Sequence, residues 1–138
     1  MTVLVVVTED DAFATAICAL ACAELSVTSV HVEEAVAAAR HDRPDIVAVD
    51  TDSVRDSQSL IGALSLLTQA RIVALGHQAW PTSRAAAEAR VAGADAVLPK
   101  PSGRASPTLA GFDRDIYRRW LIAIADRPSG GVALEAAP

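Results

Sequence analysis

The sequence has little positive charge and no long apolar run, and both shortages limit what the chain can bind. Its 138 residues include 12 lysines and arginines against 17 acidic residues, which gives a formal net charge of −5. Nucleic-acid affinity comes mostly from clustered Lys and Arg side chains that neutralise phosphates, so we expect no nucleic-acid partner. No segment approaches the ~20 uninterrupted apolar residues that a membrane-spanning helix needs, so we expect no membrane contact.

Cysteines are also few. Cys18 and Cys22 lie four residues apart in a helical pattern, and we interpret them as two small buried apolar residues. No second Cys/His pair completes a zinc site, and structural disulfides are rare inside the cell. The apolar run Val3–Val7 is too short for a signal peptide and lacks a basic segment and a cleavage site. We therefore expect a cytoplasmic protein.

What the sequence does contain is the composition of a well-packed domain. Hydrophobic residues make up 51% of the chain and charged residues 21%. The length fits one domain, since domains typically run ~100–150 residues. We assign residues 1–126 to this domain. The remaining segment, 127–138, contains Pro128-Ser129-Gly130-Gly131 and is predicted to be a flexible tail.

Runs of β-branched residues alternate with helical patterns along the chain. The apolar runs are continuous rather than alternating, as expected for strands covered on both faces in a parallel sheet. Alternating strands and helices predict an α/β fold with a doubly wound, five-stranded parallel sheet and five helices, in the flavodoxin-like (βα)5 arrangement. The expected strands are Val3–Val7, Val27–Val30, Ile46–Val49, Ile72–Leu75 and Ala96–Leu98, and the expected helices are Ala12–Leu25, Val32–His41, Ser57–Thr68, Ser83–Ala92 and Phe112–Asp126.

Charged side chains follow the predicted strands, at the edge where such sheets bind ligands. The segments after the first, third, fourth and fifth strands are Thr8-Glu9-Asp10-Asp11, Asp50-Thr51-Asp52, Gly76-His77 and Lys100-Pro101. Clustered carboxylates repel one another unless a cation sits among them, and Mg²⁺ is usually held by one or two carboxylates with waters and phosphate oxygens. Asp50 is therefore a candidate nucleophile for phosphoryl transfer, with Mg²⁺ and Lys100 neutralising the developing charge.

Three stretches resemble the receiver domains of response regulators. They are the apolar strand Leu4–Val7 running into acids, the stretch Arg43–Asp50, and the stretch Ala92–Pro101. The resemblance covers about Thr2 to Asp126. It implies that Asp50 is the phosphoacceptor, that Lys100 contacts the phosphoryl group, and that the Lys100–Pro101 bond is cis. For Asp50 taken alone, a structural helix cap at the strand end is the alternative.

The resemblance also implies that an acidic pair after the first strand helps to bind Mg²⁺, and here the pair is incomplete. Aligning the apolar face of the first helix (Phe13, Ile17, Leu20) puts Thr8 and Glu9 at the two positions, so one carboxylate is missing. Sliding the alignment by one residue restores both acids as Glu9 and Asp10 but puts alanines where the family has large core residues. We prefer the first register.

The predicted metal ligands are accordingly Glu9, Asp50 and the backbone carbonyl of Asp52. Asp10 is a weaker candidate, and with Asp11 it could contribute from the outer shell. The alternative role for both acids is to favour the N-terminus of the first helix. The side chain of Asp52 also flanks the site, in a position that tunes dephosphorylation in relatives.

The residues that relay phosphorylation in receivers are replaced. Gly76 stands where the family has a Thr or Ser, and Val97 stands where it has an aromatic residue, so the usual two-state coupling element is missing. His77 occupies the family position that gates access to the phosphoryl group. An ordinary surface histidine is the alternative.

Other differences concern partners. The segment Ser102–Gly111 lengthens the loop before the last helix, and it borders the face that receivers commonly use for dimerisation or output. With Tyr117 and Trp120 on that helix it indicates a contact surface, because aromatic residues are enriched at interfaces; plain core packing is the alternative. We expect Trp80 to be exposed in its loop, and a homodimer through the last strand and helix is a candidate assembly.

Two functions fit these features. The first is a receiver that accepts a phosphoryl group on Asp50 from a histidine kinase or a small phosphodonor, and that is no enzyme beyond its own aspartyl phosphorylation and dephosphorylation. The second is a pseudo-receiver that docks an output protein or dimerises without phosphorylation, which the residues Thr8, Gly76 and Val97 favour. A flavodoxin-like cofactor binder would need a glycine-rich phosphate loop or a stacking aromatic pair, and the sequence has neither.

Overall fold

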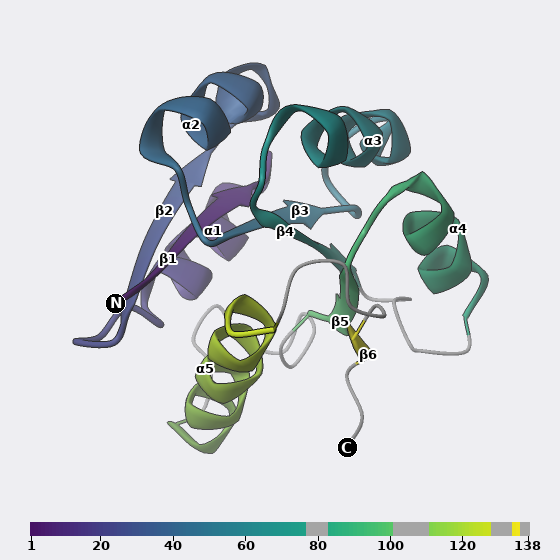
Figure 1. The fold of residues 1–138 in the computed structure, drawn as a ribbon. Coiled ribbons are helices and arrows are strands. Elements are labelled where there is room, and N and C mark those ends of the chain that lie inside the picture. The colour runs from purple at the N-terminus through teal and green to yellow at the C-terminus, as the bar shows by residue number, and fades with distance from the viewer. Residues whose placement is uncertain (77–82, 101–110, 128–133, 136–138) are drawn as a thin grey trace.

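Strands and helices alternate along the chain in the computed structural model, which describes residues 1–76, 83–100, 111–127 and 134–135 (Figure 1). The strands are β1 (Thr2–Val7), β2 (Leu25–Val30), β3 (Ile46–Asp50), β4 (Arg71–Gly76), β5 (Ala96–Pro99) and β6 (Leu134–Glu135). The helices are α1 (Asp11–Cys18), α2 (Ala35–Asp42), α3 (Ser57–Leu67), α4 (Arg84–Ala92) and α5 (Gly111–Ala125), with a 3-10 turn η1 (Val32–Glu34) before α2. Among the helices in these ranges, none has the length and apolar character to cross a membrane.

All strands run parallel in one sheet, in the order β2-β1-β3-β4-β5-β6. The first five strands with their five helices confirm the predicted doubly wound α/β fold. The two-residue strand β6 pairs with Ala96 and Val97 of β5. It lies in the segment predicted as a tail, and two residues are too few to carry a strand pattern that a sequence could reveal.

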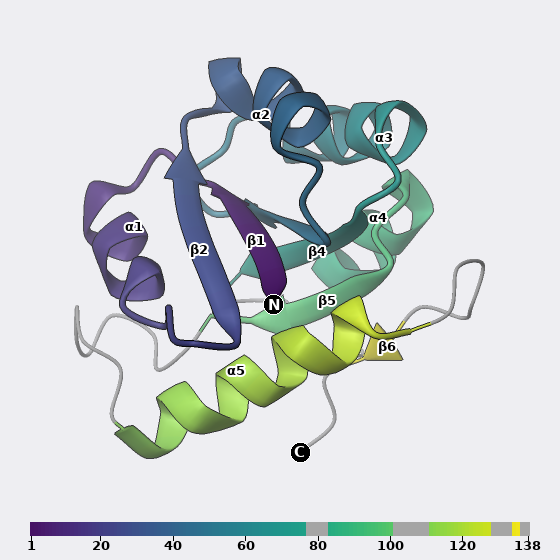
Figure 2. The same ribbon diagram turned by 60° about the vertical axis from the view of Figure 1, so that its left-hand side comes forward.

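Helices cover both faces of the sheet (Figures 1 and 2). On one face, Ile17 of α1 packs in the same cluster as Tyr117 and Leu121 of α5. On the other face, α2, α3 and α4 pack through Ala39, Ile61 and Ala86, among others. Every residue of β3 is buried, which explains the continuous apolar run in that strand. Polar side chains can therefore meet only at the strand ends.

The predicted end of the first helix at Leu25 is wrong, because α1 stops at Cys18. Leu25 is needed as the first residue of β2, where it pairs with Thr2 of β1. The chain turns in between: the Leu20 N–H donates to the Ile17 carbonyl oxygen, and Cys22 bridges to Leu25. Of the two cysteines predicted to be buried in a helix, Cys18 is half-buried and Cys22 is exposed outside it, and both are free thiols.

Gly93 joins α4 to β5 in a backbone conformation that favours glycine, with φ at +127°. A Cβ atom on this residue would lie 2.7 Å from Ser65 Oγ on α3. The glycine therefore allows both the turn and the close approach of α3.

We predict that Gly93→Ala lowers the free energy of unfolding by about 1–3 kcal/mol, because it combines a strained φ with a steric clash. Urea denaturation followed by circular dichroism measures this change. Gly62→Ala is the matched control: inside α3, its Cβ would meet the Ala92 carbonyl oxygen at 3.4 Å, an ordinary contact, and alanine favours a helix over glycine by roughly 0.5–1 kcal/mol. Equal losses in the two variants would contradict this explanation.

Candidate functional site

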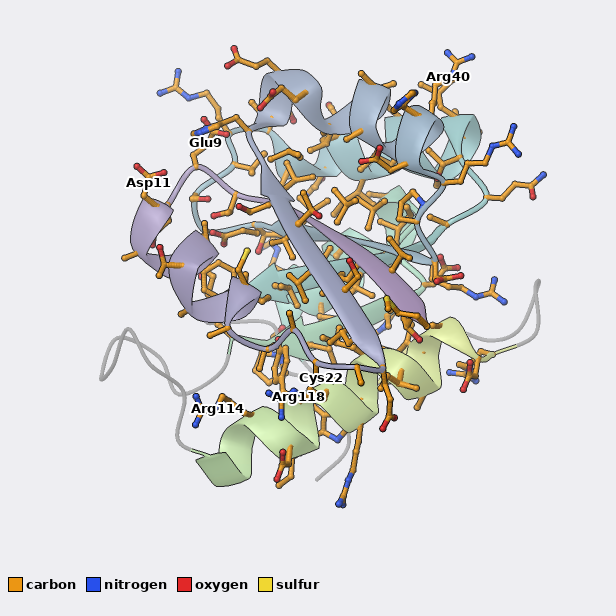
Figure 3. All side chains as sticks on the ribbon, turned by 90° about the vertical axis from the view of Figure 1, so that its left-hand side faces the viewer. Glu9, Asp11, Cys22, Arg40, Arg114 and Arg118 are labelled. Atoms are coloured by element: carbon orange, nitrogen blue, oxygen red, sulfur yellow. The ribbon has the colours of Figure 1, made fainter. Side chains whose placement is uncertain are left out.

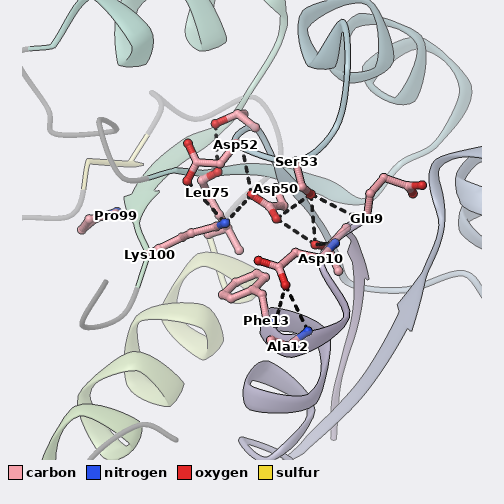
Figure 4. A network of polar contacts seen from close by, with 12 residues as sticks. Glu9, Asp10, Ala12, Phe13, Asp50, Asp52, Ser53, Leu75, Pro99 and Lys100 are labelled. Atoms are coloured by element: carbon pink, nitrogen blue, oxygen red, sulfur yellow. Dashed lines mark hydrogen bonds and ion pairs between the residues drawn. The ribbon is translucent and has the colours of Figure 1, made fainter. Parts of the chain in front are cut away.

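Three strands bring Thr8, Asp50 and Lys100 together at the carboxyl edge of the sheet, and Figure 4 shows Asp50 beside Lys100. Thr8 follows β1, Asp50 ends β3 and Lys100 follows β5. These ends lie level because the register pairs Val7 with Val49 and Gly76 with Pro99. The edge predicted to bind ligands thus contains both the predicted nucleophile and the predicted lysine.

Donor groups occupy both carboxylate oxygens of Asp50, whose side chain is fully buried. Oδ1 accepts a hydrogen bond from the Asp52 N–H at 3.1 Å and lies 2.7 Å from Lys100 Nζ. Oδ2 accepts hydrogen bonds from Thr8 Oγ1 and Ser53 Oγ, both at 2.7 Å. A carboxylate offers about four acceptor positions, so this set leaves none free. Any ligand that binds the carboxylate must displace at least one of these donors.

The surroundings of Asp50 hold it in the ionised form. Burial alone would raise its pKa, because burial disfavours the charged carboxylate. Hydrogen bonds from Lys100, Ser53 and Thr8, together with the charge of Lys100, outweigh burial and hold the pKa of Asp50 below its ordinary value of 3.8. The group is therefore a carboxylate at neutral pH, which is the form that a nucleophile requires.

Lys100 is the only lysine in the sequence, and its side chain is nearly buried between three partners. Its Nζ lies 2.7 Å from Asp50 Oδ1 and 3.3 Å from Asp52 Oδ2. It also lies 4.5 Å from the centre of the Phe13 ring of α1, close enough for a cation–π interaction. These contacts fix the ammonium group beside the carboxylate.

Glu9 turns away from Asp50 (Figure 4). Its carboxylate accepts a hydrogen bond from the Val32 N–H at 2.8 Å and lies 3.4 Å from His31 Nδ1. The hydrogen bond from Val32 is the main cause that lowers the pKa of Glu9, and Glu9 in turn raises the pKa of His31. The structure therefore places this predicted metal ligand with η1 rather than with Asp50.

The next two acids serve the start of α1. Asp10 is the N-cap residue, and its Oδ1 accepts hydrogen bonds from the N–H groups of Ala12 and Phe13 at 3.0 and 3.2 Å. Asp11 lies in the first turn of α1, where its charge suits the helix dipole. This is the helix-terminal role that the sequence left open for both acids.

Of the predicted metal ligands, the structure brings only Asp50 and Asp52 together. Within the described ranges, no group of three His, Cys, Asp or Glu side chains is placed to hold a metal ion. Mg²⁺ needs only one or two carboxylates when waters and phosphate oxygens complete its shell, so this pair fits the ion by type. Binding of Mg²⁺ remains a prediction.

The two replaced relay positions are buried. Gly76 ends β4, and Val97 packs in the core formed with α2, α3 and α4. Neither a hydroxyl group nor an aromatic ring stands at these positions to follow a change at Asp50.

Tyr117 belongs to the core rather than to a contact surface. It is 3% exposed, and its hydroxyl group donates to the Pro99 carbonyl oxygen at 2.9 Å. Burial, with a contribution from the charge of Asp50, raises its pKa. Trp120 is partly buried, with its ring centre 5.7 Å from that of Tyr117. The core-packing alternative is therefore confirmed for Tyr117.

Several predicted features lie outside the described residues. They are the gate residue His77, the exposed Trp80, the cis bond between Lys100 and Pro101, and positions 102–110 of the long loop. Their roles stay predictions.

Ser53 and Phe13 belong to the site, although the sequence analysis did not assign them to it. Ser53 Oγ donates to Asp50 and accepts from the Glu9 N–H at 2.9 Å, so it links the loops after β1 and β3. The sequence feature that could have indicated Ser53 is its position three residues after the buried acid Asp50. The contact of Phe13 with Lys100 joins two distant segments, and no local pattern indicates it.

The sequence has no match among protein-family models and none among curated proteins, but solved structures resemble it over most of its length. A chain of the complex between the P1 domain of CheA3 and CheY6 from R. sphaeroides is 26% identical, with a TM-score of 0.67 over 88% of this chain and 97% of that chain. A response regulator of Burkholderia pseudomallei is 25% identical, with a TM-score of 0.63 over 89% and 75%. The response regulator domain of Thermotoga maritima CheB is 17% identical, with a TM-score of 0.66 over 90% and 93%.

These likenesses agree with the parallel strand order and with the helical layers on both faces of the sheet. They also agree with the three stretches of sequence that resemble receivers. The chain therefore has the fold of response-regulator receiver domains.

Proposed function

We propose that this receiver accepts a phosphoryl group on Asp50, from a histidine kinase or from a small phosphodonor. The observation that supports the proposal is the buried pair of Asp50 and Lys100, whose Oδ1 and Nζ atoms lie 2.7 Å apart at the ligand-binding edge of the sheet. The similar response regulator of B. pseudomallei was solved with a phosphorylated aspartic acid and a calcium ion. CheY6 of R. sphaeroides was solved in complex with the P1 domain of CheA3, which supports a protein domain as a partner.

In the proposed reaction, a carboxylate oxygen of Asp50 attacks the phosphorus atom of the donor. With a phosphohistidine donor, a phosphorus–oxygen bond forms while the phosphorus–nitrogen bond breaks, and the imidazole leaves with the electron pair and takes up a proton. Lys100 stabilises the negative charge on the transferred group. Thr8 and Ser53 donate to Oδ2 in the resting state, so one of these hydroxyl groups must turn aside to free the attacking oxygen.

Mg²⁺ is part of this proposal. Asp50 and the backbone carbonyl of Asp52 would hold the ion, which would supply positive charge against the phosphoryl oxygens. Glu9 could join them only by giving up its hydrogen bond from Val32. We therefore expect weak metal binding.

A second candidate function is phosphorylation-independent docking of a protein partner. Two observations favour it: the protein's own donors occupy both oxygens of Asp50, and the relay positions hold Gly76 and Val97. A homodimer through the last strand and helix belongs to this candidate. Because β6 pairs with β5, a second chain would have to pack on α5 or displace β6.

Titration with Mg²⁺ and beryllofluoride separates the two candidates. For the phosphorylatable receiver, we expect saturable amide shifts in ¹⁵N-labelled protein at Asp50, Thr51 and Asp52, because beryllofluoride stands in for the phosphoryl group on a carboxylate. Asp50→Asn should abolish them. The matched control Asp52→Asn removes a neighbouring charge but keeps the nucleophile, so it should weaken the response without abolishing it. A folded wild-type protein that shows no response at millimolar Mg²⁺ would contradict phosphoryl acceptance and favour docking.

A second test supplies the missing carboxylate. We predict that Thr8→Asp tightens Mg²⁺ binding by about tenfold or more, a gain of roughly 1.4 kcal/mol or more, because another acid then faces Asp50. Without Mg²⁺, it should lower the free energy of unfolding by about 1–3 kcal/mol, through loss of a buried hydrogen bond and repulsion between like charges. Calorimetric titration and urea denaturation measure the two effects. Thr8→Val is the control that removes the same hydrogen bond without adding charge. Equal Mg²⁺ affinities in the two variants would show that position 8 does not face the metal.

A further inference from the structure

A polar cavity lies at the opposite edge of the sheet from Asp50. It has a volume of about 820 Å³ and is formed by the C-terminal ends of α2 and α3, the start of β4, and the end of α5. Asp45 and Arg71 on its wall stand at the amino ends of β3 and β4, whereas Asp50 ends β3. Figure 3 shows Arg40 of this cavity far from Glu9 and Asp11.

Four arginines from three separate segments line this cavity. Arg40 lies in the last turn of α2, Arg43 follows that helix with a left-handed φ of 46°, Arg71 begins β4, and Arg127 follows α5. The Arg71 guanidinium donates a hydrogen bond to the Arg127 carbonyl oxygen, which ties two of these segments together. The fold therefore brings to one cavity arginine residues that lie up to 87 positions apart in the sequence.

The charge of these arginines is not balanced by the cavity wall. The one acid on the wall is Asp45, and its Oδ2 already accepts a hydrogen bond from the Val3 N–H at 2.7 Å. Within the part of the chain that the structure describes, none of the four arginines forms an ion pair. Like charges gathered in this way repel one another unless an anion lies between them. In a chain whose net charge is −5, this is a marked concentration of positive charge.

One guanidinium nitrogen at this site also lacks a partner. Arg127 Nη1 is buried and makes no hydrogen bond with any residue that the structure describes. Nearly all buried polar atoms in proteins are hydrogen-bonded to protein, water or an ion. A turn of the Arg127 side chain toward the cavity would let a bound anion accept a hydrogen bond from this donor.

We propose that this cavity binds a phosphorylated small molecule that carries at least two negatively charged groups. Guanidinium groups bind phosphate oxygens through paired, charge-assisted hydrogen bonds, and four of them against one carboxylate match the charge of a diphosphate. The volume lies within the roughly 300–1,000 Å³ of ordinary ligand sites. Leu67 and Ala125 add apolar wall, which a lone inorganic anion would leave uncovered. The site is independent of the chemistry proposed for Asp50.

Calorimetric titration of the full chain with inorganic pyrophosphate at low ionic strength tests this site. We expect saturable one-to-one binding that weakens with added salt, since screening acts on exposed charges. Arg40→Gln and Arg43→Gln should each weaken the binding by about tenfold, the effect of losing one charge-assisted contact. Arg119→Gln removes the same charge from an exposed position of α5 outside the cavity, and Asp50→Asn alters the other edge. Both should leave the affinity within about twofold, since neither touches the ligand.

Amide shifts in labelled protein locate the bound anion. We expect them at Arg43, Asp45 and Arg71. No saturable binding would overturn the proposal. An equal loss of affinity in Arg119→Gln and Arg43→Gln would also overturn it, because pyrophosphate would then be attracted to surface charge in general rather than to the cavity. Shifts confined to Asp52 and Lys100 would also overturn it, because pyrophosphate would then occupy the edge that carries Asp50.

Discussion

The buried ion pair between Asp50 and Lys100 is the constraint on which the carboxyl edge of this domain depends. A carboxylate without solvent exposure is stable only if it is fully paired, and removing one partner of such a pair typically costs about 3–5 kcal/mol. Thr8, Ser53 and the Asp52 N–H complete the pairing. Because these groups come from three strand ends, the polar network also fixes how β1, β3 and β5 finish.

The same network has two opposite effects on the reactivity of Asp50. It keeps the carboxylate ionised, which favours attack on phosphorus, but it also fills both oxygens, which opposes the entry of a ligand. Because Thr8 has a hydroxyl group in place of a carboxylate, it does not repel the charge of Asp50. Glu9 accepts a hydrogen bond from the Val32 N–H and does not face Asp50. The donors that stabilise the resting carboxylate thus occupy the oxygens that a metal ion would need. Among the described residues, positive charge without an ion-pair partner lies at the far edge of the sheet, at Arg40, Arg43, Arg71 and Arg127.

Much of this arrangement could be predicted from the sequence. The parallel sheet follows from continuous apolar runs between helical patterns, and the meeting of Asp50 with Lys100 follows because the ends of parallel strands share an edge. Other features depend on contacts between distant segments. The early end of α1 reflects the pairing of Leu25 with Thr2, and the direction of Glu9 reflects its hydrogen bond from the Val32 N–H. The arginine cavity joins positions from 40 to 127, which no local pattern connects.

The pKa of Asp50, measured from the pH dependence of its side-chain carboxyl carbon by ¹³C NMR, shows directly whether the surrounding donors hold this buried group in the ionised form. We predict that Asp50 titrates below the ordinary value of 3.8, because the donors around it outweigh its burial. A carboxylate whose pKa is lower in the folded chain than in the unfolded chain stabilises the fold at pH values above its unfolded-state pKa. This stabilisation is lost as the pH falls through its folded-state pKa. A midpoint above 3.8, or a protonated Asp50 at neutral pH, would contradict the account.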